Sequence, residues 1–467
     1  MKRAIIATLL VIVLLLTIPV TLVAAYLATP DQYTDTYYGQ LTAMYDRMQQ
    51  ADGKRIILIG GSAMAFGLNV SFLEAELPDY TICPFGLYGT IGTKAMMELA
   101  LPQVREGDIV ILSPEIAEIA LSLYFSGAEL WKAAESNLDI VFNSGNLSSM
   151  LGNFPKYVAD RIAYSQNGSP KGDGVYSKAA FDENCQMTYL REYNQMPNMY
   201  DPDQPVTFEP ELLQADFVEY LNEFNRSCTE KGASVYYNFC PINRMAVSGD
   251  ADMEGFYLKL LQELDFAVMG DPAKYIMDAE WFYDSNFHLN TSGAVVYSAQ
   301  LTEDIKSVIG DNSPTPFEMP DKPVVPITQV SGDNRDADCF TFEVHEQGIH
   351  LTGRTEEGKR RSSLVIPSDY DGIPVISFSP EVFQGDAFIE ELTIPATIRS
   401  IQNDSFVACT SLKKIILQAP VPNSSVGNGL LTGCQSAMIY VPDKESYLSY
   451  IVNYYWAQYA SRITYPQ

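Results

Sequence analysis

The sequence predicts an α/β protein, with an apolar helix before its parallel-sheet domain and a small repeat solenoid after it. Three observations predict this arrangement. A run without charged residues lies near the N-terminus, short apolar runs alternate with helical patterns in the middle, and similar phrases recur near the C-terminus. Strands separated by helices usually pair in parallel, so we expect the middle of the chain to form a three-layer sandwich.

These patterns divide the 467 residues into five segments. We expect a cytoplasmic tip and transmembrane anchor over 1–29, a juxtamembrane segment over 30–54, an α/β domain over 55–311 with an insertion at 115–210, a Pro-rich linker over 312–338, and a repeat domain with a C-terminal cap over 339–467. The linker holds five prolines and shows no helical or alternating period, which is typical of a semi-rigid connector.

The anchor prediction depends on length. The uncharged run extends from Ile5 to Ala25 and follows two basic residues. About 20 apolar residues cross a ~30 Å hydrocarbon core as a helix, and basic residues favour the cytoplasmic side. We therefore expect a single-pass protein that contacts the bilayer through residues 5–28, with its N-terminus inside and its domains outside. The alternative is a signal peptide cleaved after residues 23–25; both interpretations export the protein.

Composition narrows the possible partners. The sequence has 30 Lys and Arg residues and 58 Asp and Glu residues, so its net charge is −28, and such a charge repels nucleic acid. The seven cysteines include no C-x-x-C pair, which argues against a zinc site and a dense disulfide framework. No carboxylate cluster has metal-ligand spacing, and the glycines at 60–61 lack the lysine of a phosphate-binding loop. We expect no cofactor and no metal.

The α/β domain begins with a strand at 55–59 that leads into Gly-Gly-Ser at 60–62. Further strands are expected at 80–83, 109–112 and 233–237; helical patterns cover 40–50, 91–104 and 121–138, with others starting at a Ser71–Glu74 capping box and near Pro210. In open parallel sheets, sites gather at the carboxyl ends of the strands. Ser62 and Gly86 both fall at that edge.

Histidine is scarce in this sequence. The chain has only His288, His345 and His350, and the last two lie beyond the linker. If Ser62 is a nucleophile that takes its base from its own domain, His288 is the one candidate.

Three blocks together resemble the SGNH (GDSL-like) hydrolase superfamily over about residues 50–310. They are the Gly-Gly-Ser at 60–62, the loop Phe-Gly-Leu-Tyr-Gly at 85–89, and the segment from Asp284 through His288 to Gly293. The closest likeness is to the membrane-anchored branch that modifies bacterial cell-surface polymers. The resemblance implies a bacterial cell surface, Ser62 as nucleophile, His288 as general base, Asp284 as the acid that orients it, and an oxyanion hole from the backbone N–H groups of Ser62 and Gly86.

The sequence departs from the family pattern at three positions. Gly61 replaces the usual aspartate, Ser285 stands three residues before His288 where the acid is normally found, and Glu115 follows the third strand in place of an asparagine donor. Gly61, Glu115 and Asn290 are expected to line the site.

Each of these residues also has a purely structural interpretation. The Gly-Gly-Ser sequence fits a tight strand-to-helix turn, and Gly86 fits a turn glycine. His288 fits a cap of the final helix, and Asp284 fits part of a turn. The tyrosines of the 115–210 insertion, such as Tyr176, fit either a sugar-stacking platform or packing against the domain.

A repeat appears beyond the linker. Phe378 recurs as Ile401 and Leu392 as Ile415, each 23 residues later, whereas Leu364 precedes Leu392 by 28. A period in the low twenties with one short strand per unit indicates leucine-rich repeats. Residues 362–442 resemble the BspA-like (Treponema-type) repeats of bacterial surface proteins, and 443–463 is expected to form a helical cap. The resemblance implies a protein or glycan ligand; a spacer is the alternative.

Two functions follow from the sequence. The first is a membrane-anchored extracellular esterase or acyltransferase acting on a cell-envelope polysaccharide or teichoic-acid-like polymer, with repeats that bind a ligand. The second is a non-catalytic adhesion protein built on a degenerate SGNH scaffold. Because about 25 residues separate the anchor from the first strand, the first function places the site close to the bilayer.

Overall fold

The computed structural model describes residues 17–196, 199–323, 334–345, 348–420, 422, 425–427, 429–453 and 455–466. Residues 17–28 are helical, whereas residues 5–16 of the expected anchor lie outside the described residues. Within the described part of the chain, no helix has the length and apolar character needed to cross a bilayer. The anchor therefore stays a prediction.

A five-stranded parallel sheet forms the centre of the first domain. Its strands are β1 (Lys54–Gly60), β2 (Tyr80–Gly86), β3 (Ile109–Ser113), β4 (Ser234–Tyr237) and β6 (Ala267–Val268). The order is β2-β1-β3-β4-β6, and every pair in it is parallel. Continuous apolar runs explain why β1 to β4 were predictable from the sequence, whereas the two-residue β6 was not predicted.

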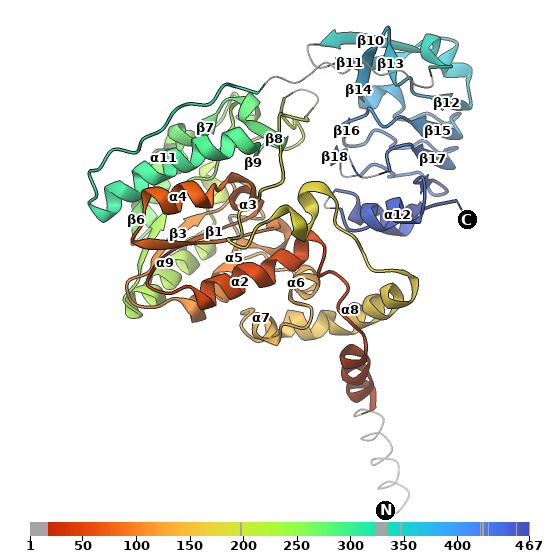
Figure 1. The fold of residues 1–467 in the computed structure, drawn as a ribbon. Coiled ribbons are helices and arrows are strands. Elements are labelled where there is room, and N and C mark those ends of the chain that lie inside the picture. The colour runs from red at the N-terminus through yellow and green to blue at the C-terminus, as the bar shows by residue number, and fades with distance from the viewer. Residues whose placement is uncertain are drawn as a thin grey trace, which may run out of the picture.

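Helices cover both faces of this sheet, which confirms the predicted mixed α/β layers. They are α2 (Gln40–Gln50), α3 (Ser62–Gly67), α4 (Val70–Glu76), α5 (Thr93–Ala100), α9 (Ala215–Glu230), α10 (Met253–Glu263) and α11 (Thr291–Ile309). Figure 1 shows α4 and α11 on one face and α2 and α5 on the other. The predicted Ser71–Glu74 capping box is wrong: Asn69 caps α4 by accepting the N–H of Phe72, so the helix begins one position before Ser71.

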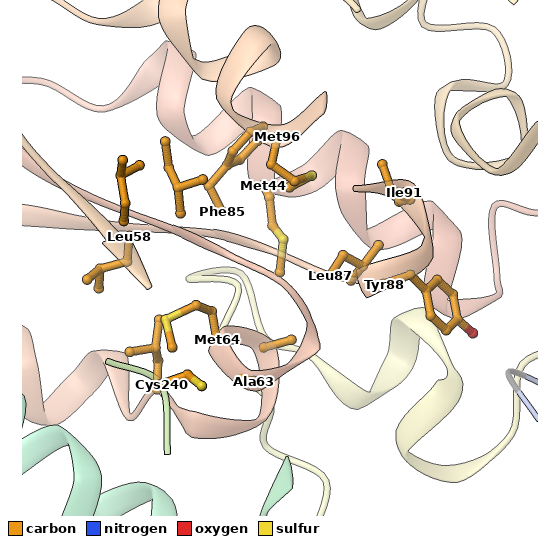
Figure 2. Close-up of a cluster of buried hydrophobic side chains, with 14 of the residues drawn as sticks. Met44, Leu58, Ala63, Met64, Phe85, Leu87, Tyr88, Ile91, Met96 and Cys240 are labelled. Carbon is orange, nitrogen blue, oxygen red and sulfur yellow. The ribbon is translucent and has the colours of Figure 1, made fainter. Parts of the chain in front are cut away.

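The core beneath the first strand-to-helix turn is densely packed. Ala63 and Met64, directly after Ser62, are fully buried. Figure 2 shows Ala63, Met64 and Cys240 on one side of the strands, and Phe85 and Met96 on the other. The turn that carries Ser62 therefore has little freedom to move. All seven cysteines are buried and free, as the small apolar interpretation of this residue type expects.

The insertion after β3 contains α6 (Gly127–Ala134), α7 (Leu138–Phe142) and α8 (Leu147–Asn167). The helix expected over 121–138 is wrong in its first part, because 121–126 are irregular and Ser126 caps α6 by accepting the N–H of Glu129. Aromatic residues in this stretch weakened the helical period that would have marked the true start.

Short strands complete the first domain. β5 (Ile242–Asn243) pairs with β7 (Ile276–Met277), and β8 (Phe282–Ser285) pairs with β9 (His288–Leu289) as an antiparallel hairpin. Asn290 then caps α11 by accepting the N–H of Gly293. The hairpin thus places Asp284 and His288 immediately before a long helix that packs on α3 and α4.

The C-terminal part is a stack of short strands in two sheets. One has β10 (Phe340–His345), β11 (Gly348–Arg354), β14 (Ile373–Phe378), β16 (Ser400–Ile401) and β18 (Ser425–Val426), with β13 (Asp369–Tyr370) beside β14; the other has β12 (Ser363–Val365), β15 (Glu391–Ile394), β17 (Lys414–Leu417), β19 (Met438–Tyr440) and β20 (Ile463–Thr464). Phe378 pairs with Ile401 and Leu392 with Ile415, as the 23-residue period predicts. Leu364 pairs with Leu392 despite its longer spacing.

The C-terminal cap joins the two parts of the molecule. It contains α12 (Lys444–Tyr450) and a 3-10 helix at Ala457–Arg462. Tyr450 and Trp456 belong to the repeat core, whereas Leu448, Ile451 and Val452 pack into the core of the α/β domain. Figure 1 shows α12 at the end of the stack, beside the α/β domain. The cap predicted from the sequence is therefore also the contact between the domains.

Candidate functional site

The candidate site lies where the strand order of the sheet changes direction. The chain leaves β1 for β2 on one side and later enters β3 on the other, and both β1 and β3 end at this edge. Ser62 follows β1 and Glu115 follows β3. Crevices at such switch points are the usual binding sites of open parallel sheets.

Three predicted residues form a hydrogen-bonded chain. The Nε2 atom of His288 lies 2.8 Å from Oγ of Ser62, and its Nδ1 lies 2.7 Å from Oδ1 of Asp284. The side chains of His288 and Asp284 are 6% and 18% exposed, so water competes little with these bonds. This is the order nucleophile, base, orienting acid that activates a serine hydroxyl.

An aromatic ring packs against one face of the His288 imidazole. The ring of Phe66, on α3, stacks on His288 with centroids 3.9 Å apart and planes inclined by 9°. Buried Arg191 donates to the carbonyls of Phe66 and Leu289, which ties α3 to β9. These contacts fix the ring plane in which both nitrogens make their hydrogen bonds.

Two tyrosines from distant parts of the chain support Asp284. The hydroxyl of Tyr176, from the insertion, donates to Oδ2 of Asp284 at 2.8 Å. The hydroxyl of Tyr455, from the C-terminal cap, donates to the backbone carbonyl of Asp284 at 3.2 Å. Tyr176 is packed against the domain, with its ring near Tyr37 and Phe66. The insertion therefore holds the carboxylate of Asp284, and the repeat domain holds its backbone.

Glu115 lies beside the serine. Its Oε1 accepts the N–H of Ala63 at 2.9 Å and lies 3.5 Å from Oγ of Ser62, so the imidazole is the closer acceptor for the hydroxyl proton. Its Oε2 is buried without a hydrogen-bond partner among the described residues. Burial raises the pKa of the Glu115 carboxyl above its usual range.

The glycines of the turn are required by close contacts. A Cβ on Gly61 would overlap the Glu115 carboxylate, and one on Gly86 would lie 2.6 Å from the carbonyl oxygen of Gly61. Gly61 is also the residue before α3, so the interpretation of 60–62 as a tight strand-to-helix turn holds together with the site. Glycine at 61 leaves the space that Glu115 fills, which links two of the departures from the SGNH pattern that the sequence resembles.

Two of the three expected lining residues, Gly61 and Asn290, are not in the wall of the cavity beside Ser62, whereas Glu115 is. Asn290 does not line the site: it is fully buried, and its amide donates to the carbonyls of Glu280 and Phe282. As Asn290 makes the helix cap, His288 is free of that role. Ser285, at the position where the SGNH pattern has its acid, lines the cavity and pairs with His288 in the hairpin, but its side chain makes no hydrogen bond to the imidazole.

A cavity of about 490 Å³ opens over these side chains. Ser62, His288 and Glu115 lie in its wall together with apolar residues of the insertion such as Ile116 and Ala120. Its volume suits a small substrate group, and its walls combine an apolar surface with a few polar groups, as binding sites usually do. Tyr455 of the repeat domain completes the wall.

Sequence reasoning missed Phe66, Arg191 and Tyr455. Each acts through a tertiary contact that no local pattern encodes: Tyr455 lies 171 residues from Asp284. Arg191 is buried, and burial lowers its pKa to about 10. A single arginine in a polar, weakly periodic stretch gives no signal of this role.

Comparison with known proteins identifies the C-terminal part. A family model described as "BspA type Leucine rich repeat region" matches residues 376–465 in six copies, so this part of the chain consists of BspA-type leucine-rich repeats. A crystal structure of a leucine-rich repeat protein of T. pallidum (TpLRR) matches with 18% identity over 23% of this chain and 70% of that chain; its TM-score of 0.17 carries no further argument. No curated protein matches the chain.

Proposed function

We propose that this chain is a serine-dependent esterase or acyltransferase of the SGNH type that acts on a glycopolymer of the cell envelope. The observation that carries the proposal is the continuous hydrogen-bonded chain from Ser62 through His288 to Asp284. The chain is anchored in the membrane by residues 5–28, and its repeats bind the polymer or a surface partner.

The reaction follows from this geometry. His288 takes the hydroxyl proton at Nε2 while Oγ of Ser62 attacks the ester carbonyl, and Asp284 stabilises the imidazolium that forms. The tetrahedral intermediate expels the alcohol, which receives the proton from Nε2. Water or a second hydroxyl then loses its proton to Nε2 of His288 and attacks the acyl-serine. The second tetrahedral intermediate releases Oγ of Ser62, which takes this proton back, and the products are those of hydrolysis or transfer.

Oxyanion stabilisation is the unusual part of the proposal. Backbone N–H groups of Ser62 and Gly86 would supply donors, and Glu115 stands where the family has an amide. A carboxylate at this place repels an oxyanion, whereas a neutral carboxylic acid donates a hydrogen bond to it. The raised pKa of Glu115 favours the neutral acid.

A fluorophosphonate probe tests the nucleophile. The wild-type protein should be labelled on Ser62 with release of fluoride, and Ser62→Ala and His288→Ala should lose the label. Ser285→Ala is a matched control, because this serine lines the same cavity without bonding to His288. Labelling that survives in Ser62→Ala contradicts the assignment.

A non-catalytic surface protein is the second candidate, and the Glu115 carboxyl beside Ser62 is the observation that favours it. If the folded wild type takes no label over the pH range in which it is stable, the site is a scaffold. The BspA-type repeats would then carry the function by binding a ligand.

A further inference from the structure

A second cavity continues the first one toward the repeats. It has a volume of about 440 Å³ and lies between the α/β domain and the strands β16 and β18. Both cavities share five lining residues, namely Thr90, Ile119, Asp203, Gln204 and Tyr455. A space that begins at Ser62 thus extends between the domains and ends on the repeat sheet.

The domains hold each other across this space. The backbone N–H of Asn403, in the repeats, donates to Oδ2 of Asp203 at 3.2 Å. Asp201 orients this loop by accepting from the N–H of Asp203 and the amide of Gln204. Together with the Tyr455–Asp284 bond, this contact fixes the repeat sheet relative to the triad.

The lining has a defined chemistry. No lysine or arginine lines either cavity among the residues that the structure describes, whereas Glu118, Asp201 and Asp203 do. Such walls repel phosphates and uronates, as does the net charge of −28. The remaining polar groups are hydroxyls and amides, for example Ser400, Asn403 and Gln458, which donate to and accept from sugar hydroxyls.

We propose that the two cavities form one groove that binds an uncharged, hydroxyl-rich polysaccharide, with the ester at Ser62 and the sugar chain continuing onto β16 and β18. This inference rests on the proposed esterase or transferase function and sharpens it. It selects a neutral glycan over the teichoic-acid-like polymer that the sequence left open, and it gives the repeats a share in substrate binding.

The test compares acetyl esters whose sugar chains differ in length and charge. The full chain in detergent is assayed with p-nitrophenyl acetate, with acetylated xylo-oligosaccharides of two to eight sugars, and with acetylated polygalacturonate as the anionic counterpart. We expect kcat/KM to rise about tenfold or more with oligosaccharide length, because remote contacts contribute binding energy to the reaction, and to stay low for the anionic polymer.

Ser400→Phe fills the groove at β16 without touching the triad. It should reduce kcat/KM for the longest oligosaccharide about tenfold, to the level of the disaccharide, and leave p-nitrophenyl acetate cleavage and fluorophosphonate labelling unchanged. Lys413→Phe places the same bulk on an exposed position of the repeats and should change neither.

The outcomes separate this inference from the proposed function. Equal rates for short and long neutral esters, or efficient cleavage of the anionic polymer, overturn the groove while the enzyme assignment stands. If wild type neither labels nor cleaves any ester, the enzyme assignment fails. Calorimetry then tests the groove separately. The Ser62→Ala variant should bind the octasaccharide, and the double variant Ser62→Ala, Ser400→Phe should bind it more weakly. Equal binding by the two variants overturns the groove.

Discussion

At the scale of single residues, two departures from the SGNH pattern that the sequence resembles compensate each other. Gly61 has no side chain where Glu115 needs space, and the Glu115 carboxyl in turn accepts the N–H of Ala63 at the start of α3. An aspartate at 61 and an asparagine at 115 would each fit a different arrangement of this turn. Each of the two replacements, taken alone, suggests a loss of function. In the structure, Gly61 and the Glu115 carboxyl pack directly against each other.

Glu115 predicts an unusual pH dependence. Since burial raises its pKa, the neutral acid persists above the ordinary titration range of a carboxyl group, and labelling of Ser62 should slow as pH rises through that raised pKa. Glu115→Gln keeps a neutral donor and should remove this decline. Glu115→Ala loses the donor and should slow labelling by about 10²–10³ at pH values below that pKa, where wild type keeps the neutral acid, as measured by the second-order rate constant with the probe.

Stability gives an independent readout of the same residue. A carboxyl with a raised folded-state pKa binds its proton more tightly in the folded state, so it costs stability as pH rises above the unfolded value. Glu115→Gln should therefore raise Tm relative to wild type, and more so at pH 8 than at pH 4. Slow labelling in Glu115→Gln at all pH values would show that an ionised Glu115 is needed instead.

At the scale of elements, the sequence predicted long and periodic pieces well. β1, β3 and α2 agree closely with their patterns, and the repeat pairs Phe378 with Ile401 as the period requires. The β8–β9 hairpin was not predicted, because two- to four-residue strands have no period to detect. Ser62, His288 and Asp284 were nevertheless found, since residue type and chain order are visible without the fold.

The N-cap of α11 predicts a stability effect close to the site. Asn290→Ala removes the cap and leaves the carbonyls of Glu280 and Phe282 without their donor, so we expect a loss of about 2–4 kcal/mol in the free energy of unfolding. Urea denaturation measures it. Asn137→Ala removes the cap of α7 on the surface and should cost about 1 kcal/mol or less. Equal losses in both variants would contradict the buried role of Asn290.

The cap of the repeats shows why a purely modular interpretation of the sequence is incomplete. The α12 segment was expected to close the repeat stack, yet part of it packs into the α/β domain. Pattern alone marks the segment as amphipathic and aromatic but does not say which surface covers its second face. Tyr455 joins the triad region for the same reason, through a contact that exists only after the domains dock.

At the scale of the whole molecule, apolar contacts hold the domains together. Leu448, Ile451 and Val452 are at most 8% exposed, whereas the Lys171–Glu445 ion pair is exposed at both ends and contributes little. Leu448→Asp should therefore separate the domains, which small-angle X-ray scattering detects as a larger radius of gyration, while 1 M NaCl should not separate wild type. Phe388→Asp, at an exposed position of the repeats, is the matched control.

The Leu448→Asp variant also tests whether contact between the domains affects the site at Ser62. Once the repeats swing away, Asp284 loses the hydroxyl of Tyr455 and the groove loses one wall, so long neutral esters should be cleaved no faster than short ones. Ser62 should still be labelled, because Phe66, Arg191 and Tyr176 hold the imidazole and the acid from within the α/β domain. If Leu448→Asp expands the molecule and the length preference survives, the repeats bind something other than the substrate chain.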